Sequence, residues 1–251
     1  MSSLQQFFDQ HKPKSTPGVS AIALAQVDHA FGTARLPRTL IALDVCCGAG
    51  KLTGALADRG FRALGLDISI RFIGREAGSG AAFAITDLSR GLPITAGSVD
   101  LICCIDSLQY FADPRATLHE MARVLQSGGT LILSTQNNSN PAGLKRWAIE
   151  HLTGRPWSPW LAHPIENHLT ERQLRQLLAE AGFTIEYVRG LQFLTAWVSV
   201  LPRGVRNWSP WPGKPWRSLA SLSQRISLFA TIEESALARI AMITFVRARK
   251  R

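Results

Sequence analysis

Three aspartates and a short glycine-rich turn are the residues whose types and spacing could do chemistry in this chain. Asp44, Asp67 and Asp87 each stand near the end of an apolar run, and the turn Gly48–Gly50 follows the first of them. Glycines allow a backbone to approach a ligand closely, and a carboxylate accepts hydrogen bonds from two neighbouring hydroxyl groups at once. The pattern predicts a site for a nucleotide-like cofactor.

The residues around the turn bear on which cofactor it holds. A dinucleotide-binding turn reads G-x-G-x-x-G, whereas Gly48, Gly50 and Gly54 are spaced one residue too wide at the third glycine. Asp44, ahead of the glycines, would repel a pyrophosphate but suits a cofactor with an ammonium group and a sulfonium. Asp87 is placed to accept from an adenine amino group. These features favour S-adenosylmethionine, and a nicotinamide cofactor stays as the last alternative.

Alternating strands and helices must position these side chains. Apolar runs rich in β-branched residues predict strands, and longer amphipathic segments between them predict helices, so we expect an α/β fold with a doubly wound, mostly parallel, seven-stranded Rossmann-like sheet. In such a sheet the three aspartates meet at one edge. The expected strands are 39–47, 62–69, 81–89, 99–106, 130–137, 184–190 and 238–250, and the expected helices are 51–60, 69–78, 114–129 and 169–183.

The domain organisation is expected to be one cofactor-binding unit with additions. We predict an N-terminal helical cap over 1–38, the cofactor-binding domain over 39–190, an insertion or lid over 191–236 and the last strand of the sheet over 237–251. Within the insertion, residues 191–232 hold five basic residues, four tryptophans and no acid. Rings and cations together suit a lid on an apolar acceptor, an anionic membrane surface or single-stranded nucleic acid, and ordinary packing of a small subdomain is the alternative.

At the level of motifs, the sequence resembles the class I S-adenosylmethionine-dependent methyltransferases of the small-molecule group. The resemblance covers Thr39 to Gly190 and its motifs agree in order and spacing. They read "LDVCCGAG", "GLDIS", "ITDLSRGLPITAGSVDLI", "LHEMARVLQSGGTLILS" and "NHLTERQLRQLLAEAGF".

This resemblance implies S-adenosylmethionine as the cofactor and a role for each matching residue. An acid on the first strand organises the methionine amino group, and the turn beside it approaches the methionine moiety. The second-strand acid holds the ribose hydroxyls, the third-strand acid meets the adenine amino group, and two residues past the fourth strand border the donor methyl. In this order the residues are Asp44; Cys47, Gly48 and Gly50; Asp67 with Ile68 against the adenine; Asp87 with Leu88; and Ile105 with Asp106.

The catalytic base is not assigned from the sequence. Many small-molecule methyltransferases carry a histidine pair or a Glu-His after the fourth strand, where this chain has Gln109 and Tyr110. That departure removes the commonest base and argues against the metal site of quinone-type O-methyltransferases. His163, His168, Asp106 and Tyr110 remain as candidates.

No metal site is expected from the cysteines either. They form two adjacent pairs, Cys46-Cys47 and Cys103-Cys104. Neighbours on a strand point to opposite faces, so the members of a pair do not chelate one ion together. We expect them to be buried as small apolar residues.

The expected function is therefore methyl transfer to a small-molecule or lipid-like acceptor. A formal charge of +10 raises an RNA methyltransferase as an alternative, although no appended RNA-binding module is visible, so a nucleic acid partner is not favoured. A non-catalytic binding protein that keeps the fold is the other alternative. No signal peptide or membrane-spanning run stands out, which favours a cytoplasmic location. Peripheral membrane contact through 191–232 is left open, as is the oligomeric state.

Overall fold

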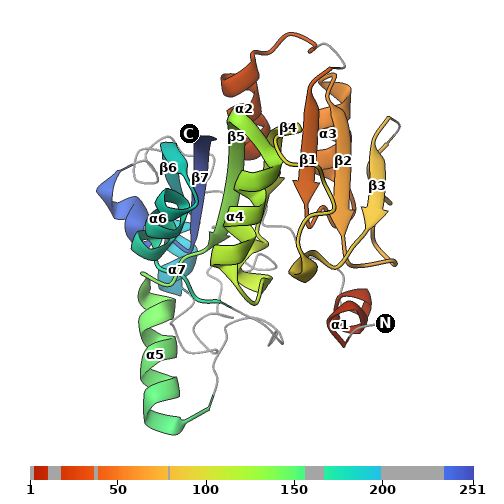
Figure 1. Ribbon diagram of the computed structural model, residues 1–251. Helices are drawn as coiled ribbons and strands as arrows, with labels where there is room; N and C mark the ends of the chain where they lie inside the picture. Colours follow the sequence, from red (N-terminus) through yellow and green to blue (C-terminus); the bar gives the residue numbers. More distant parts are fainter. Residues whose placement is uncertain (1–2, 11–17, 37–38, 79, 156–166, 199–234) are drawn as a thin grey trace, which may run out of the picture.

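The computed structural model describes residues 3–10, 18–36, 39–78, 80–155, 167–198 and 235–251. It contains a seven-stranded sheet in the order β3-β2-β1-β4-β5-β7-β6 (Figure 1). The expected α/β fold with a doubly wound sheet is thereby confirmed. The strands are β1 (Ile41–Val45), β2 (Arg62–Asp67), β3 (Ala82–Ile85), β4 (Val99–Cys104), β5 (Leu125–Gln136), β6 (Phe183–Leu191) and β7 (Ile243–Lys250).

The direction of the strands decides which ends share an edge. β1 pairs in parallel with β2 and β4, β2 with β3, and β4 with β5. β7 is antiparallel and lies between β5 and β6. The carboxyl ends of β1 to β6 and the start of β7 therefore meet at one edge of the sheet, where parallel α/β sheets bind their ligands.

Helices cover both faces of the sheet. They are α1 (Ser3–Gln10), α2 (Val19–Phe31), α3 (Lys51–Asp58), α4 (Pro114–Val124), α5 (Pro141–Thr153), α6 (Glu171–Glu180) and α7 (Phe193–Val198). One core lies between the sheet and α4 with α6, and the other lies between the sheet and α2 with α3. Cys104 belongs to the first core and Cys103 to the second, because successive strand residues point to opposite faces.

Two helices begin with side-chain caps. Pro114 opens α4, and the Asp113 side chain accepts from the amide of Ala116 at 3.0 Å. Thr170 caps α6 in a capping box with Gln173. Each cap satisfies backbone N–H groups that a helix start otherwise leaves without partners.

Several sequence-based boundaries were wrong. Where a helix was expected over 69–78, residues 70–76 form turns, because Gly74 has a left-handed backbone (φ 68°) and the segment bonds to the glycine turn instead. The helix expected over 114–129 ends at Val124, since Leu125 is already extended and pairs with Val99 of β4. The last strand starts at Ile243, after a short 3-10 helix at Ala236–Ile240. Helix α5 was not expected.

The predicted additions to the sheet are only partly described. Helices α1 and α2 lie within the predicted N-terminal cap. Of the predicted insertion over 191–236, the structure describes 191–198, which hold the last residue of β6 and α7, and 235–236, whereas 199–234 lie outside the described residues. None of the described helices is long and apolar enough to cross a membrane.

Candidate active site

The glycine turn connects β1 to α3 and needs glycine at defined points. The amide of Cys47 donates to the carbonyl of Leu66 at 3.0 Å, which ties the turn to β2. Gly50 is left-handed (φ 82°) at the start of α3, and a Cβ there would come within 2.7 Å of the Phe83 ring. A Cβ on Gly54 would lie 1.8 Å from the carbonyl oxygen of Ala77. Gly48 also has a left-handed backbone (φ 53°), so the first two predicted glycines shape the turn, while Gly54 allows close packing behind it.

Asp67 ends β2 beside this turn. Its Oδ2 accepts from the amide of Gly48 and its Oδ1 from the amide of Ser69, both at 2.8 Å. The side chain is buried, which raises its pKa, and these backbone bonds oppose the shift. Each carboxylate oxygen keeps further acceptor capacity. The pair of oxygens is therefore held at a fixed orientation and can still accept from two ribose hydroxyls.

Asp44 lies on β1 beneath the turn. It is 3% exposed, and the Thr53 hydroxyl donates to its Oδ2 at 2.6 Å. Burial raises the pKa of Asp44 to about 7, with a further upward contribution from Asp67 and a downward one from Thr53. A cationic group beside Asp44 would favour its ionised form. Its chemistry therefore fits a ligand that brings an ammonium group.

A cavity of about 710 Å³ opens at the ends of β2 and β3. Ile68 and Asp87 line it, so two residues predicted for the adenine lie together. Leu88 follows Asp87 at the start of the short 3-10 helix Leu88–Arg90. Gln5 of α1 lines the same cavity. Sequence patterns gave no signal for Gln5, because it is far from every motif.

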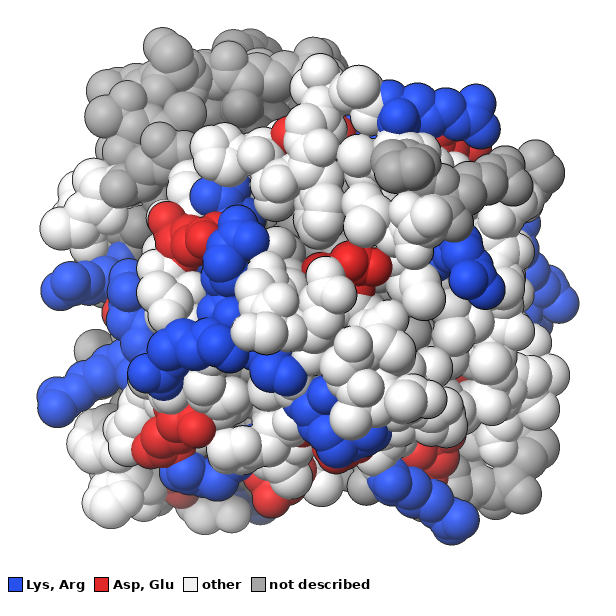
Figure 2. Space-filling view, turned by 45° about the horizontal axis from the view of Figure 1, so that its top comes forward, with Lys and Arg blue, Asp and Glu red and all other residues white. Residues whose placement is uncertain are grey.

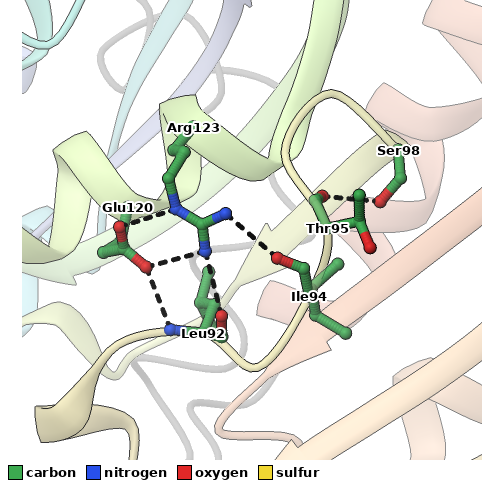
Figure 3. Close-up of polar contacts among 6 residues, drawn as sticks. All are labelled: Leu92, Ile94, Thr95, Ser98, Glu120 and Arg123. Carbon is green, nitrogen blue, oxygen red and sulfur yellow. Dashed lines mark hydrogen bonds and ion pairs between the residues drawn. The ribbon is translucent and has the colours of Figure 1, made fainter.

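Two charged side chains of α4 fix one wall of this cavity (Figure 3). Arg123 donates to the carbonyls of Leu92 and Ile94, both at 3.0 Å, and Glu120 accepts from the amide of Leu92 at 3.1 Å. The same two side chains form an ion pair at 2.8 Å. Because Glu120 and Arg123 both bond to backbone groups, they fix the path of the backbone over 92–94 and not the positions of its side chains.

The end of β4 carries the residues predicted to border the donor methyl. Ile105 and Asp106 are both half-buried, and Asp106 has a left-handed backbone (φ 54°). Ser134 of β5 holds this conformation: its hydroxyl donates to Asp106 Oδ1 at 2.9 Å, and its carbonyl accepts from the Asp106 amide at 3.0 Å. Unfavourable backbone conformations of this kind persist where the surroundings enforce them, often at functional sites.

Gln109 and Tyr110 occupy the short 3-10 helix Leu108–Tyr110 after β4. Gln109 is 1% exposed; its side chain donates to the Asp106 carbonyl at 2.8 Å and accepts from the Thr135 hydroxyl at 3.0 Å. Its amide thus has a structural partner at both ends. Among the described residues, no group of three or more His, Cys, Asp or Glu side chains is placed to hold a metal ion.

His168 is not arranged as a catalytic base. Its Nδ1 is hydrogen-bonded to the Arg146 guanidinium. Because a guanidinium only donates, Nδ1 must be the acceptor and the proton lies on Nε2. Burial first, and then the charge of Arg146, lower the pKa of His168 to about 4. The ring is therefore neutral and its basic nitrogen is occupied. His163, the other histidine candidate, lies outside the described residues.

The chain has an α/β fold, and the residues at the carboxyl ends of its strands are chemically suited to a nucleoside-type cofactor. A methyltransferase domain family matches residues 21–188, so the chain belongs to that family. This agrees with the resemblance to the class I S-adenosylmethionine-dependent methyltransferases, the family whose cofactor is S-adenosylmethionine.

Individual relatives agree with this assignment. The chain is 29% identical to a ubiquinone biosynthesis O-methyltransferase of Idiomarina loihiensis over 60% of this chain and 64% of that protein. It is 27% identical to one of Xanthomonas axonopodis pv. citri over 81% of this chain and 79% of that protein. The chain thus spans just under two thirds of the first relative.

The solved structures support the fold. Geranyl diphosphate C-methyltransferase from Streptomyces coelicolor, solved with Mg²⁺, geranyl diphosphate and S-adenosylhomocysteine, has a TM-score of 0.59 and 16% identity, covering 92% of this chain and 79% of that one.

Proposed function

We propose that the chain transfers the methyl group of S-adenosylmethionine to a small-molecule acceptor, with the predicted residues at the ends of β1 to β4 holding the cofactor. The observation that carries this proposal is the joint position of Asp67 and the glycine turn. One carboxylate oxygen holds the amide of Gly48, and both oxygens retain acceptor capacity. Asp44 beneath them supplies a carboxylate for an ammonium group.

The residues fit the cofactor along its whole length. Asp44 suits the methionine amino group, and the turn at Gly48 and Gly50 suits the methionine moiety. Asp67 suits the ribose hydroxyls. Asp87 and Ile68 suit the adenine. Gly50 supports this fit, since a Cβ there would collide with Phe83 at 2.7 Å and displace the turn. When bound, the cofactor supplies an electrophilic methyl group on a sulfonium.

The protein contributes position and shielding to the reaction. Methyl transfer is an in-line displacement, so fixing the acceptor atom opposite the sulfur removes much of the entropic barrier. Asp106 lies at this end of the sheet, where Ser134 donates to its carboxylate and the Gln109 side chain donates to its backbone carbonyl. We assign Asp106 to the contact with the acceptor side of the donor methyl.

A lipid-like acceptor is supported by helix α5, which projects from the body of the molecule (Figure 1). Its side chains Leu144, Trp147 and Leu152 are 67%, 61% and 82% exposed, while Arg146 between them is 6% exposed. The helix thus presents apolar groups outward, which suits an apolar partner. Peripheral membrane contact through 191–232 stays a proposal, because most of that segment lies outside the described residues.

RNA is the second acceptor class to test, since the formal charge is +10. On the face shown in Figure 2, lysine and arginine side chains form several groups, with acidic side chains among them. The basic side chains on this face therefore do not form the single continuous basic stripe that is typical of a nucleic acid-binding surface.

The experiment is a coupled assay for S-adenosylhomocysteine release with three acceptor probes: a phenol carrying a prenyl chain, the same phenol without the chain, and total RNA. Release with either phenol supports a small-molecule acceptor, and a higher kcat/KM with the prenylated one supports a lipid-like acceptor. Release with RNA alone would show that the acceptor class is wrong. Cofactor binding without release of S-adenosylhomocysteine with any of the three probes would favour the non-catalytic alternative.

A further inference from the structure

Helix α1 lies at the carboxyl ends of the strands, outside the motifs that carry the cofactor assignment (Figure 1). Its Gln5 lines the 710 Å³ cavity together with Ile68 and Asp87. Ile68 and Asp87 are the residues assigned to the adenine, so one side chain of α1 shares the wall of the proposed adenine pocket.

Asp9 fixes the same helix to the end of β2. Its Oδ1 accepts from the Ser69 hydroxyl at 2.6 Å and from the Arg71 amide at 3.1 Å. Ser69 is 3% exposed, and its own amide donates to Asp67 Oδ1 at 2.8 Å. A single residue therefore stands between Asp9 and the carboxylate assigned to the ribose.

A second contact holds α1 near the end of β4. The rings of Phe8 and Tyr110 meet edge to face with their centres 5.9 Å apart. In the sheet, β1 lies between β2 and β4. Helix α1 contacts residues that follow β2 and residues that follow β4, the two neighbours of β1. It therefore spans the end of β1, where the glycine turn begins.

Helix α1 depends on these contacts for its order. It has eight residues, and isolated helices of fewer than about 12 residues are marginal in water. Its docking free energy must therefore come from Asp9, Phe8 and the groups beneath it. Any ligand that adds contacts to docked α1 stabilises the docked state, and docked α1 strengthens that ligand's binding to the same extent.

We propose that α1 is a wall of the cofactor site, in which Gln5 contacts the adenine moiety and Asp9 is a positioning residue that acts on Asp67 through Ser69. This inference rests on the cofactor assignment above and adds to it an element that the family motifs do not contain. Cofactor binding and the docking of α1 are then one coupled equilibrium.

The first test compares two glutamines of the same helix by calorimetric titration with S-adenosylhomocysteine. Gln5→Ala should weaken binding about three- to tenfold, as expected for one lost hydrogen bond. Gln6→Ala is the matched control, because Gln6 is exposed and does not line the cavity. Equal affinities of the two variants would overturn the role of Gln5.

The second test separates positioning by Asp9 from a merely structural role. Asp9→Ala removes the acceptor for Ser69 and Arg71, and it should weaken S-adenosylhomocysteine binding about five- to tenfold. Asp9→Asn retains a side-chain oxygen that can accept both bonds, so it should restore the affinity to within about twofold. Loss of affinity in both variants, or in neither, would contradict the proposal.

Hydrogen exchange of the wild-type protein completes the test. The amides of residues 3–10 should exchange more slowly with saturating S-adenosylhomocysteine than without it. Unchanged exchange, with binding demonstrated by calorimetry, would overturn the coupling of α1 and leave the cofactor assignment intact. Failure of the wild-type protein to bind S-adenosylhomocysteine would instead overturn the cofactor assignment itself.

Discussion

Single residues in this protein gain their properties from burial at the carboxyl ends of the strands. Asp44 is the clearest case: it is 3% exposed, and its pKa is raised to about 7 although Thr53 donates to it. A carboxyl group that titrates near neutral pH can respond to a cationic ligand. Sequence patterns predict this aspartate for the cofactor site, but its depth under the turn depends on the packing of α3.

The raised pKa predicts how cofactor affinity depends on pH. An ammonium ligand favours ionised Asp44, so protonation of Asp44 in the free protein competes with binding. From a pKa of about 7, S-adenosylhomocysteine should bind roughly tenfold more tightly at pH 8 than at pH 6. Asp44→Asn should bind weakly at both values, without this slope. Calorimetric titrations of both proteins at the two pH values measure this dependence. The same change of affinity with pH in the wild type and in Asp44→Asn would contradict the role of Asp44.

The raised pKa of Asp44 also predicts how the free energy of unfolding depends on pH, and this dependence has the opposite sign to that of cofactor affinity. Its folded-state pKa of about 7 lies above the ordinary aspartate value, so stability falls as the pH rises toward 7 and the buried carboxylate ionises. At pH 8, cofactor-free Asp44→Asn should be more stable than the wild type, on the order of 1–3 kcal/mol. At pH 4, where Asp44 is protonated, urea unfolding should give similar free energies. A less stable variant at pH 8 would refute this account.

Asp106 shows how a neighbouring strand sets a residue's conformation. Ser134 donates to its carboxylate and accepts from its amide, which holds the left-handed backbone (φ 54°). Ser134→Ala should lower kcat about fivefold for an accepted substrate, because the lost hydrogen bond removes about 1 kcal/mol of positioning. Its affinity for S-adenosylhomocysteine should stay within about twofold, since Ser134 is not assigned to the cofactor. Loss of affinity with unchanged kcat would contradict the assignment of Asp106 to the donor-methyl end.

At the scale of elements, regular strands and capped helices were predictable because their signals are local. The apolar runs of β1 and β4 and the capping box at Thr170 need no distant partner to be recognised. The turns at 70–76 were missed because Gly74 and the bonds to the glycine turn break an apparent helix. Helix α5 was missed since its exposed Leu144 and Trp147 and its buried Arg146 reverse the usual pattern.

Gly54 tests the packing of α3 behind the turn. Helix propensity alone would make Gly54→Ala stabilising by about 1 kcal/mol. The added Cβ would stand 1.8 Å from the Ala77 carbonyl oxygen, so the variant should instead be destabilised by roughly 1–3 kcal/mol. Urea unfolding decides the sign, and a stabilised variant would show that α3 and the segment at 77 do not pack this closely.

At the scale of the whole molecule, the site is built from elements far apart in the chain. Helix α1, the ends of β2 and β3, and α4 all line the 710 Å³ cavity. The motifs located the strand ends correctly because the order of a parallel sheet brings them to one edge. The motifs did not indicate Gln5 or Asp9, because the positions of these residues depend on how a short N-terminal helix docks on that edge.

The central claim is that Asp67 and the glycine turn hold S-adenosylmethionine. Calorimetric titration with S-adenosylmethionine, S-adenosylhomocysteine and NAD tests it most directly, on the wild type, Asp67→Ala and the exposed control Asp58→Ala. We predict binding of the first two ligands to the wild type and the control, weakened about 100-fold in Asp67→Ala through two lost charge-assisted bonds. Binding of NAD alone, or unchanged affinity in Asp67→Ala, would contradict the account.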